Sequence, residues 1–500
     1  MEKNRMLPRW NRAFALMLVG GLGLSLGSNA DSELPVVGPD AVVPVEAQAW
    51  AAFNWASYDQ DKVVSWGDYQ YSVYWGEDRV LSVVRRNRSN DEVQIVRLED
   101  YLLAEGFPES QQRNGHRNTV IGISPGDGRV HISWDHHAND LNYTRSRAGL
   151  ITEPPEEITA ADFEPRQPIA EGAPQRVTYP RFFNDFNETL YFFYRSGGSG
   201  SGNIALFEYD ADNGSWSMVS DRLFGLEGVY EPWENSESRN AYMHDLLFDE
   251  SGRLHITWVY REVSRTWASN HDLHYAYSDN QGRSWYNNAG EMIADTREGE
   301  QITIDSPGIV VYDIPVFTWI MNQCAMTLDS QNRPHIATYH MEETFHPENL
   351  QHDPPADEQH RLNYYHYWRD DAGVWHRSKP LDLPLPRRST SRGNGMTFPA
   401  EWIYRPMIVA APDDTLIMYF ASNDGFMAHV AKAEDNWSEW QTIRLTGPEV
   451  GGSDATKPDR RLLRNEGILS FTADTNGLEP GRGFGFVDIS LERILAALGD

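Results

Sequence analysis

Four short segments of the sequence concentrate the side chains that could do chemistry. One contains His116, a second contains the adjacent His136 and His137, a third contains Tyr179, and the fourth carries Arg195 directly before a glycine-rich stretch. An arginine beside such a loop can bind a carboxylate or sulfate group that approaches the backbone. Imidazole and phenol groups can transfer protons, but they also occur as solvated turn residues or as packing residues.

The other histidines are best understood from their place in the repeats. Adjacent residues of an extended strand point to opposite sides, so we expect at most one of His136 and His137 to face a site. His131, His255 and His335 occupy one and the same repeat position, in the motifs Val-His-Ile, Leu-His-Ile and Pro-His-Ile. We expect each of these three to make a structural hydrogen bond within its strand.

Several arginines lie close to the candidate segments. Arg239 and Tyr242 form a second arginine and tyrosine pair ahead of a repeated strand. The first half of the chain also contains further arginines near these positions, namely Arg117, Arg145, Arg147, Arg181 and Arg195. The pattern suggests a groove for a polyanion, although mixed surface charges are ordinary.

The composition limits the classes of function. With 43 Lys and Arg against 73 Asp and Glu, the formal charge is −30, which disfavours binding to nucleic acid or to an anionic membrane. The 17 Trp, 23 Tyr and 20 Phe supply enough apolar area for a large core. A single cysteine, Cys324, excludes an internal disulfide, so its thiol is inert, a metal ligand or a nucleophile.

The first thirty residues have the pattern of a secretory signal. An apolar stretch, Ala13 to Leu26, precedes the small-residue cleavage site Ser28-Asn29-Ala30. The basic region before it contains Lys3, Arg5, Arg9 and Arg12. We therefore expect residues 1–30 to be removed and 31–500 to form one exported domain without a membrane span; an uncleaved anchor is the alternative.

A repeated strand pattern must position the candidate side chains. Alternating strands recur at 128–134, 252–258 and 333–339, with looser copies beginning near 69, 189, 415 and 467. Each is followed by a second strand, an Asp- or Gly-containing turn and a Trp, which is typical of antiparallel hairpins. Seven units of about 65 residues predict an all-β fold, a seven-bladed β-propeller of four-stranded antiparallel blades, with six or eight blades as alternatives.

Two further patterns agree with this fold. Ser278–Trp285 matches an Asp-box turn with Asn280 at the Asp position, which marks a propeller scaffold but says little about chemistry. A helical pattern is clear only at Leu491–Leu498, and no phosphate-binding glycine motif is present. We therefore expect no organic cofactor.

The segments described above resemble the secreted bacterial ulvan lyases of polysaccharide lyase families 24 and 25. The resemblance runs from about His116 to Trp375, and it is most specific in GDGRVHISWDHH, TYPRFF, FFYRSGGSGSGN, NHDLHYAYSDNQGRSW and NQCAMTLDSQNRPH. It implies a seven-bladed propeller that cuts ulvan, a sulfated polymer of rhamnose and uronic acid, by β-elimination. The product would carry a 4,5-unsaturated uronyl end.

The resemblance also implies catalytic roles. The family pattern has two histidines, a tyrosine and an arginine, and here His116 and His137 are 21 residues apart and Tyr179 and Arg195 are 16 apart. Arg195 would neutralise the C6 carboxylate of the uronate, and Tyr179 would be the main base and acid, provided that nearby cations lower its pKa. His116 would be its partner at C5 or O4, and His137 would orient the groups. The predicted substrate-binding residues are Tyr242, Arg239, His136 and Arg181.

A structural zinc is a second feature that the resemblance implies. Its predicted ligands are His271, Cys324, His340 and His360, with His274, His335 and His366 as substitutes. One thiolate and three imidazoles suit tetrahedral zinc, but the same residues could be hydrogen-bonded core residues. The sequence does not decide whether calcium is also bound.

Two other functions stay open on the sequence alone. A sialidase-like propeller hydrolase shares the Asp-box and uses a tyrosine nucleophile, but it needs an arginine triad and several such boxes. A non-catalytic propeller could hold sugar with the same arginines and aromatic residues. The choice between glucuronate and iduronate, and between endo and exo cleavage, is equally open, and we expect a monomer whose partner is an anionic algal polysaccharide.

Overall fold

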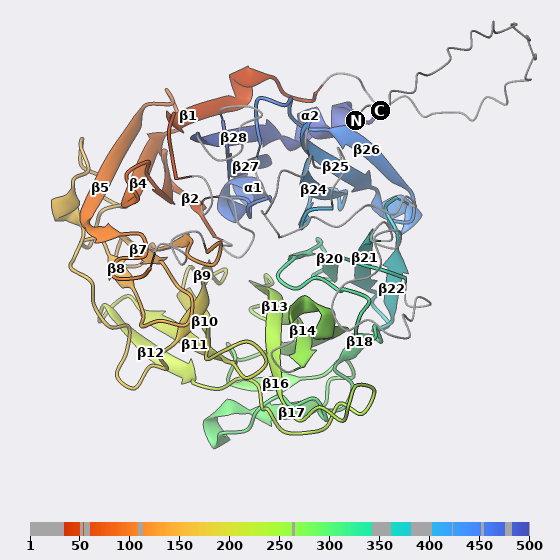
Figure 1. Cartoon of the computed structure of the whole chain (residues 1–500). Helices are drawn as coiled ribbons and strands as arrows, with labels where there is room; N and C mark the ends of the chain where they lie inside the picture. The colour runs from red at the N-terminus through yellow and green to blue at the C-terminus, as the bar shows by residue number, and fades with distance from the viewer. Residues whose placement is uncertain are drawn as a thin grey trace, which may run out of the picture. The chain divides into compact units, whose positions relative to one another are not determined.

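The repeated strands pair into seven antiparallel sheets that follow one another around a ring (Figure 1). The computed structural model describes residues 35–50, 54, 61–108, 114–262, 266–342, 362–381, 403–422, 424–451, 455–475 and 483–499. Each sheet is one blade of a β-propeller. The predicted all-β, seven-bladed fold is therefore confirmed, while the predicted leader, residues 1–30, lies outside the described ranges.

Four blades have four strands each, paired in chain order. The first contains β2 (Val63–Trp66), β3 (Tyr69–Trp75), β4 (Val80–Asn87) and β5 (Val93–Leu102). The third contains β9 (Val177–Asn184), β10 (Leu190–Ser196), β11 (Asn203–Asp210) and β12 (Ser215–Ser220). The fifth contains β19 (Ala325–Leu328), β20 (Pro334–His340), β21 (Asn363–Arg369) and β22 (Trp375–Ser378), and the sixth β23 (Met407–Ala410), β24 (Leu416–Ser422), β25 (Gly425–Ala431) and β26 (Trp440–Arg444).

The second and fourth blades depart from four regular strands. The second has β6 (Thr119–Ser124), β7 (Arg129–Trp134) and β8 (Tyr143–Arg145), and an irregular segment takes the fourth place, since the amide of Glu164 donates to the carbonyl of Arg145 at 2.8 Å. The fourth blade has six strands, of which β18 pairs with β15. They are β13 (Arg239–Phe248), β14 (Leu254–Glu262), β15 (Asn270–Ser278), β16 (Ser284–Tyr286), β17 (Met292–Asp295) and β18 (Val310–Tyr312).

The seventh blade joins the two ends of the described chain. It consists of β27 (Ile468–Ala473), β28 (Phe484–Ser490) and β1 (Val42–Glu46), with β1 antiparallel to β28 (Figure 1). Residues 455–459 run along the other edge of β27, because the amide of Asp459 donates to the carbonyl of Ser470 at 2.8 Å and the hydroxyl of Thr456 donates to the carbonyl of Thr472 at 2.9 Å. The N-terminal strand thus closes the ring.

The helices are short. They are α1 (Arg460–Glu466), α2 (Leu491–Ala496) and the 3-10 helices η1 (Pro39–Ala41), η3 (Ala160–Asp162), η4 (Thr266–Ser269), η5 (Thr296–Glu298) and η6 (Ala433–Asp435). The carboxylate of Asp459 caps α1 by accepting the amide of Leu462 at 3.0 Å. None of the helices in the described part of the chain is long and apolar enough to cross a lipid bilayer.

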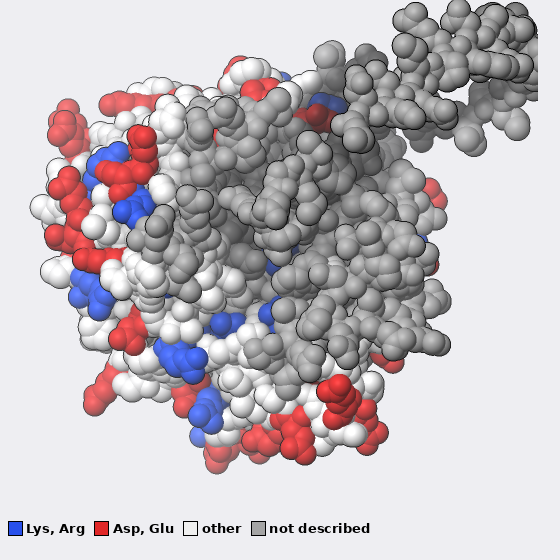
Figure 2. Space-filling view, in the orientation of Figure 1, with Lys and Arg blue, Asp and Glu red and all other residues white. Residues whose placement is uncertain are grey.

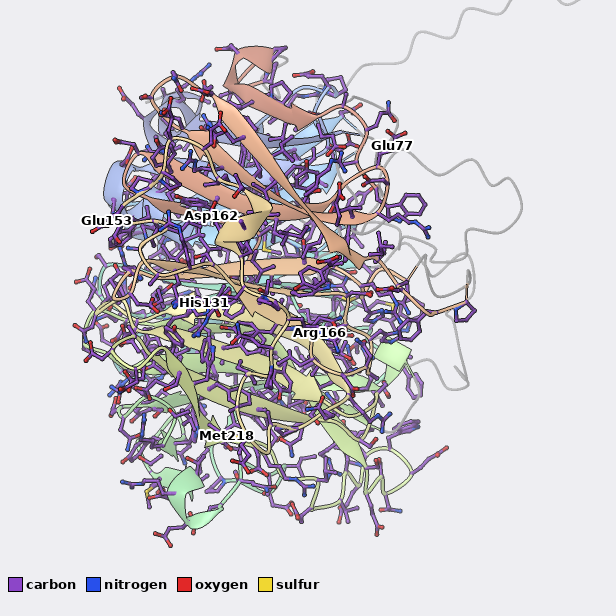
Figure 3. The ribbon with its side chains drawn as sticks, turned by 90° about the vertical axis from the view of Figure 1, so that its left-hand side faces the viewer. Glu77, His131, Glu153, Asp162, Arg166 and Met218 are labelled. Carbon is purple, nitrogen blue, oxygen red and sulfur yellow. The ribbon has the colours of Figure 1, made fainter. Side chains whose placement is uncertain are left out.

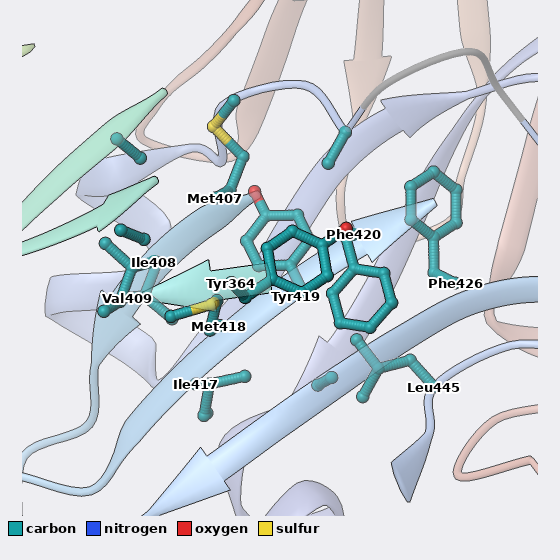
Figure 4. Close-up of a cluster of buried hydrophobic side chains, with 14 of the residues drawn as sticks. Tyr364, Met407, Ile408, Val409, Ile417, Met418, Tyr419, Phe420, Phe426 and Leu445 are labelled. Atoms are coloured by element: carbon teal, nitrogen blue, oxygen red, sulfur yellow. The ribbon is translucent and has the colours of Figure 1, made fainter. Parts of the chain in front are cut away.

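The core lies between the blades. Each blade packs against two neighbours, so strands such as β13 and β14 are buried along their whole length. The largest apolar cluster joins the last three blades, and Figure 4 shows part of it around Tyr364, Tyr419, Phe420 and Phe426. Continuous burial on both faces explains why these strands are rich in apolar and aromatic residues.

The repeated histidines are part of this scaffold. The Nδ1 atom of His131 lies 2.7 Å from the Tyr143 hydroxyl, and His255 makes the same contact with Tyr275 at 2.7 Å. His335 instead contacts the Nε2 atom of His366 at 2.9 Å. His131, labelled in Figure 3, has no exposed surface. The predicted structural hydrogen bonds of these three histidines are present, but each links the histidine to the next strand of its blade and not to its own strand.

The Asp-box turn has the predicted scaffold role. The amide oxygen of Asn280 accepts the backbone N–H of Ser284 at 2.8 Å, and the buried Trp285 donates its indole N–H to the carbonyl of Gly282 at 3.0 Å. An asparagine therefore replaces the usual aspartate without loss of the turn.

Candidate active site

The four predicted catalytic residues come together at one end of the inner strands. The rings of His116 and His137 stack at a centroid distance of 4.3 Å, and the rings of His116 and Tyr179 are 5.4 Å apart. The guanidinium carbon of Arg195 lies 4.8 Å from the centroid of the Tyr179 ring. His116 precedes β6, His137 follows β7, Tyr179 is in β9 and Arg195 is near the end of β10, so two adjacent blades supply the cluster.

A bulge in β9 sets the direction of the Tyr179 side chain. Arg181 pairs with Phe193 and Thr178 pairs with Arg195, so two residues of β9, Tyr179 and Pro180, lie opposite one residue of β10. Tyr179 has a φ of 58°, in the left-handed region, and Pro180 has no N–H to donate to the ladder. The bulge breaks the regular alternation at the point where the phenol must reach the histidine pair.

One asparagine connects the two stacked imidazoles. The amide oxygen of Asn114 lies 2.6 Å from Nδ1 of His116, and its amide nitrogen lies 2.5 Å from Nδ1 of His137. Burial, the neighbouring His137 and the cations Arg195, Arg261 and Arg405 hold the pKa of His116 well below its ordinary value. Burial, Arg195 and Arg117 lower the pKa of His137 to about 4. Both rings are therefore neutral near neutral pH.

Only one member of the predicted histidine pair faces this cluster. His136 is fully buried, and its Nε2 atom lies 3.1 Å from the Ser133 hydroxyl and 3.2 Å from the amide of Asn142. The expectation that the two histidines point to different sides is confirmed, and His137 is the one in the cluster. The imidazole of His136 has no surface for a ligand, so we do not assign it a substrate contact.

Arg195 is held by Tyr242. An Nη1–H of Arg195 donates to the Tyr242 hydroxyl at 3.0 Å, and an Nη1–H of Arg261 donates to the same oxygen at 2.9 Å. The Tyr242 hydroxyl in turn lies 3.1 Å from the hydroxyl of Ser199 in the glycine-rich loop. Burial raises the pKa of Tyr242, but Arg261 and Arg195 outweigh it, so the net direction is downward.

Arg261 is a functional residue that was not predicted from the sequence, although a signal for it exists. Arg195 is the second of a Tyr-Arg pair at the end of β10, and Tyr260-Arg261 stands at the end of β14, the equivalent strand of the next blade. Arg261 is itself anchored, because its Nε donates to Asn270 at 2.8 Å and its Nη2 to Asn322 at 2.9 Å. The repeat of this pair identifies a second cation of the cluster.

The six arginines expected to gather in a groove are mostly elsewhere. Among them, only Arg195 is in the cluster. Arg145 and Arg147 pair with Glu164 and Asp162 at 2.8 Å each, outside the inner strands. The remaining three are buried in ion pairs, Arg117 with Asp135, Arg181 with Asp61 and Asp245, and Arg239 with Glu262. Of the predicted set, only Arg195 is therefore a cation of the site, and it is joined by Arg261 and Arg405, which also act on His116.

Two predicted substrate-binding arginines belong to these buried pairs. Arg181 donates to the carboxylates of Asp61 at 2.9 Å and Asp245 at 2.8 Å. Arg239 is fully buried and donates to Glu262 at 3.0 Å and to the carbonyls of Leu226 and Glu227 at 2.8 Å each. Their guanidinium groups are satisfied within the protein, so we do not carry their predicted substrate contacts further.

Three of the predicted zinc ligands lie within the described residues, where each of them contacts other groups of the protein. His271 lies between the carboxylates of Glu262, at 3.1 Å, and Asp272, at 2.9 Å. His340 contacts the carbonyl of Met341 at 2.6 Å and the hydroxyl of Tyr367 at 2.7 Å. Cys324 is buried, with its sulfur 3.8 Å from the carbonyl of Met321.

The zinc prediction stays a prediction. His360 lies outside the described residues. Of the substitutes, His335 and His366 bond to each other, and the ring of His274 stacks on Trp258 at 5.2 Å. Within the ranges that the structure describes, no three His, Cys, Asp or Glu residues form a group that could hold a metal ion.

Acidic and basic side chains are unevenly distributed on the described part of one face. In Figure 2, acidic side chains gather around the perimeter of the face shown, and a few basic side chains are visible in the hollow near its centre. A local group of basic side chains can attract an anionic ligand to a protein whose net charge is negative.

Comparison with known proteins gives a consistent picture. Residues 69–382 match the family described as BNR repeat-containing family member. The chain is 23% identical over 313 residues to an "Ulvan lyase, long isoform" of Alteromonas sp. (strain LOR), covering 53% of this chain and 30% of that protein. It is 24% identical over 254 residues to an "Ulvan lyase, long isoform" of Pseudoalteromonas sp. (strain PLSV), covering 42% of this chain and 25% of the relative. The matched part is thus less than a third of either relative.

Solved structures share the fold. The crystal structure of the polysaccharide lyase Uly1 covers 90% of this chain and 99% of its own, with a TM-score of 0.63 and 17% sequence identity. The structure of an ulvan lyase of polysaccharide lyase family PL25 covers 91% of this chain and 99% of its own, with a TM-score of 0.62 and 11% identity. At these identities the likeness concerns the propeller architecture.

Proposed function

This chain belongs to the BNR repeat-containing family, and we propose that it is a polysaccharide lyase that cleaves ulvan by β-elimination. The two relatives from Alteromonas and Pseudoalteromonas described above are named ulvan lyase. The cluster of His116, His137, Tyr179 and Arg195 is the proposed active site. Its products would carry a 4,5-unsaturated uronyl group at the new end.

The observation that carries this proposal is the unpaired charge of Arg195. Its side chain is buried, with 4% of the residue exposed, and among the described residues no carboxylate pairs with it. Its Nε atom is buried and has no hydrogen-bond partner in that part of the chain. The buried arginines 117, 181 and 239 each have a carboxylate partner. A desolvated guanidinium without an anion is costly, so the site is built for an anionic ligand.

The arrangement suits removal of a proton next to a carboxylate. Arg195 would bind the C6 carboxylate and stabilise the negative charge that develops when the proton leaves C5. The electrons of the C5–H bond form the C4–C5 double bond, the C4–O4 bond breaks, and O4 takes up a proton, so atoms and charge balance. Tyr179 would act as the main base and acid, His116 as its partner, and His137 as an orienting group.

Tyr242 has a supporting role in this scheme. Its hydroxyl accepts an Nη1–H of Arg195 and so holds the guanidinium beside the ring of Tyr179. Arg261 on the other side of that hydroxyl adds a second positive charge next to the carboxylate site. The predicted substrate contact of Tyr242 is thus proposed as an indirect one, through Arg195.

The test is to incubate the purified protein with ulvan and to follow the ultraviolet absorbance of the new conjugated double bond. We expect the wild type to produce this absorbance, and so should the control variant Arg147→Ala, because Arg147 is a partly exposed residue away from the cluster. The variants Tyr179→Phe and Arg195→Ala should not produce it, although their circular dichroism spectra should match that of the wild type. New reducing ends without that absorbance would identify a hydrolase, and binding without either product would identify a carbohydrate-binding propeller. Both outcomes would contradict the proposal.

We further propose that the protein is exported and acts as a monomer. Ulvan is a polymer too large to enter a cell intact, and residues 1–30 have the pattern of a signal. Export is tested by N-terminal sequencing of protein recovered from the medium or periplasm, and the monomer by light scattering. A chain that keeps Met1 in the cytoplasm, or a stable dimer, would contradict this part.

A further inference from the structure

The side chain of Asn114 lies between two imidazoles that stack on each other. Its Oδ1 atom is 2.6 Å from Nδ1 of His116, and its Nδ2 atom is 2.5 Å from Nδ1 of His137. The two rings are nearly parallel, with 8° between their planes. One amide therefore contacts the same ring atom of both histidines, but with a different end for each.

The direction of this amide is fixed by a second contact. Oxygen and nitrogen of an asparagine side chain are assigned from their hydrogen bonds. Here the backbone N–H of His116 also donates to Oδ1 of Asn114, at 3.1 Å. A backbone N–H can only donate, so the atom that it meets must be the oxygen. The NH₂ group is then the end that faces His137.

The donor and acceptor rules now determine both rings. An amide oxygen only accepts, so Nδ1 of His116 must carry a hydrogen; an amide nitrogen only donates, so Nδ1 of His137 must present a lone pair. We propose that Asn114 is a positioning residue that locks the pair in opposite tautomers, with the proton of His116 on Nδ1 and that of His137 on Nε2. A neutral imidazole has one N–H and one lone pair, so Nε2 of His116 has the lone pair and Nε2 of His137 has the N–H.

The charges around His116 and His137 favour neutral rings. Only a neutral imidazole has two tautomers, because a protonated ring carries a hydrogen on both nitrogens. Among the described residues, the charged side chains that act most strongly on the rings are cations, Arg195, Arg261 and Arg405 for His116 and Arg195 and Arg117 for His137. Together with burial they keep the pKa of each imidazole below its usual range. Protonation of either ring would add a positive charge next to these guanidinium groups and next to its stacked partner.

The two rings then have different tasks, and this step rests on the proposed function. His116 presents an acceptor nitrogen and can take up a proton. A neutral His137 can donate a hydrogen bond to an anionic oxygen of the substrate, but it does not give up its remaining proton readily. Asn114 would thus decide which of two otherwise equivalent histidines accepts and which donates.

The variant Asn114→Asp separates this role from a merely structural one. It keeps the shape and the acceptor that faces His116, but it replaces the donor that faces His137 by an acceptor. A matched control is Asn139→Asp, because the Asn139 oxygen accepts the backbone N–H of His137 at 2.7 Å. The control also adds a negative charge next to His137, but the Asn139 oxygen contacts the backbone of His137 and not its ring nitrogen.

Neutron diffraction from crystals exchanged into heavy water locates the protons directly. In the wild type and in Asn139→Asp we expect deuterium on Nδ1 of His116 and on Nε2 of His137. In Asn114→Asp we expect deuterium to appear on Nδ1 of His137, while His116 is unchanged. Deuterium on Nε2 of His116, or on Nδ1 of His137, in the wild type would overturn the proposal, and so would an unchanged His137 in Asn114→Asp.

The experiment is independent of the substrate. It is done on the protein alone, so a failure to cleave ulvan would refute the proposed function and leave the tautomers as measured. Conversely, wild-type tautomers other than those expected would refute the role of Asn114 even if ulvan is cleaved. The wild-type map decides the question if the Asn114→Asp variant does not fold.

Discussion

Arg195 differs from the other buried arginines in what its guanidinium contacts. Its hydrogen bond goes to a phenol, Tyr242, whereas Arg117, Arg181 and Arg239 contact carboxylates. A phenol that also accepts a bond from a second arginine cannot neutralise two charges fully. At the scale of single residues, the distinguishing feature of the site is therefore the buried guanidinium of Arg195, which has no carboxylate partner among the described residues.

Replacing the guanidinium of Arg195 by an ammonium group tests the role of this cation directly. Arg195→Lys keeps the charge but loses the planar donors that match a carboxylate. We expect the rate of elimination to fall by about 10²–10³-fold, the loss typical of one donor to a developing oxyanion. Initial rates of ultraviolet absorbance on ulvan measure it, with Arg147→Lys at the rim as control. A rate within a factor of about two of the wild type would contradict the assignment.

The hydroxyl of Tyr242 can be removed without changing its ring. In Tyr242→Phe, Arg195 and Arg261 both lose their shared acceptor. A hydrogen bond to a charged group contributes about 1.5–3 kcal/mol, so we expect kcat/KM to fall by about 10–100-fold. Because the ring still fills its buried place, the thermal midpoint should change little. An unaltered kcat/KM would show that the hydroxyl does not orient Arg195.

Spacing and repeat position could predict part of this site. The separations of His116, His137, Tyr179 and Arg195 pointed to four residues that the structure brings together. Asn114 could not be found in this way, because its importance lies in which of its two atoms faces which ring. Residue type also could not distinguish Arg195 from the arginines that fold into ion pairs, since pairing depends on carboxylates far away in the chain.

At the scale of elements, inner strands and helix α1 meet at a buried carboxylate. Asp245 of β13 accepts hydrogen bonds from Arg181 of β9 at 2.8 Å and from Arg460 of α1 at 2.8 Å, and it also pairs with Lys457. Asp245 has no exposed surface. One side chain thus ties the third and fourth blades to the segment that accompanies the seventh, directly next to the bulge that carries Tyr179.

Removing this charge should cost more than removing a surface charge. Asp245→Asn leaves two buried cations and Arg460 without their common partner, and breaking a buried pair in this way costs about 3–5 kcal/mol. The matched control is Asp279→Asn, because Asp279 pairs with Arg253 at the surface at 2.6 Å, and we expect about 0–1 kcal/mol there.

Denaturant titrations of both variants give the two free energies of unfolding. Equal losses for Asp245→Asn and Asp279→Asn would show that the buried network does not hold the blades together.

The strands were predictable and their irregularities were not. Alternation and recurring turns indicate β7, β14 and β20, because each strand packs on two faces in the same way. The bulge at Tyr179 and Pro180 depends on how β9 registers against β10, and the six strands of the fourth blade depend on pairing across a long insertion. Those features arise from tertiary contacts that local patterns do not record.

At the scale of the whole molecule, the structure combines a strongly acidic chain with buried neutral histidines. The formal charge is −30, and Figure 2 shows the acidic groups mainly around the perimeter. Burial lowers the pKa of several histidines, to about 3 for His136, His244, His340 and His429 and to about 4 for His274. All five rings are buried; His244 and His274 lie in the fourth blade, and the other three lie in the second, fifth and sixth blades.

Such histidines make stability depend on pH with a definite sign. Their native pKa values are below the unfolded value of about 6.5, so on acidification the unfolded chain binds protons first. Each ring then lowers the free energy of unfolding by up to ~1.4 kcal/mol per pH unit below pH ~6.5. The pKa of His271 is raised by Asp272 and Glu262 despite burial, so this one residue has the opposite sign.

We therefore expect the protein to unfold on mild acidification, before the native rings themselves titrate at about 3 to 4. Denaturant unfolding at a series of pH values, followed by tryptophan fluorescence, measures the slope. A free energy of unfolding that stays constant between pH ~6.5 and ~4.5 would contradict the buried neutral histidines. The variant His429→Gln should reduce the slope, because it removes one of the titrating groups.

The claim that joins these scales is that the cluster around Arg195 eliminates rather than hydrolyses. The mass of the oligosaccharides released from ulvan by the full-length protein tests it most directly. Elimination adds no water, so the fragments with the new non-reducing end should be lighter by one water than hydrolytic fragments and should carry the unsaturated uronyl group. Fragments that have gained a water, with a saturated end, would contradict the account.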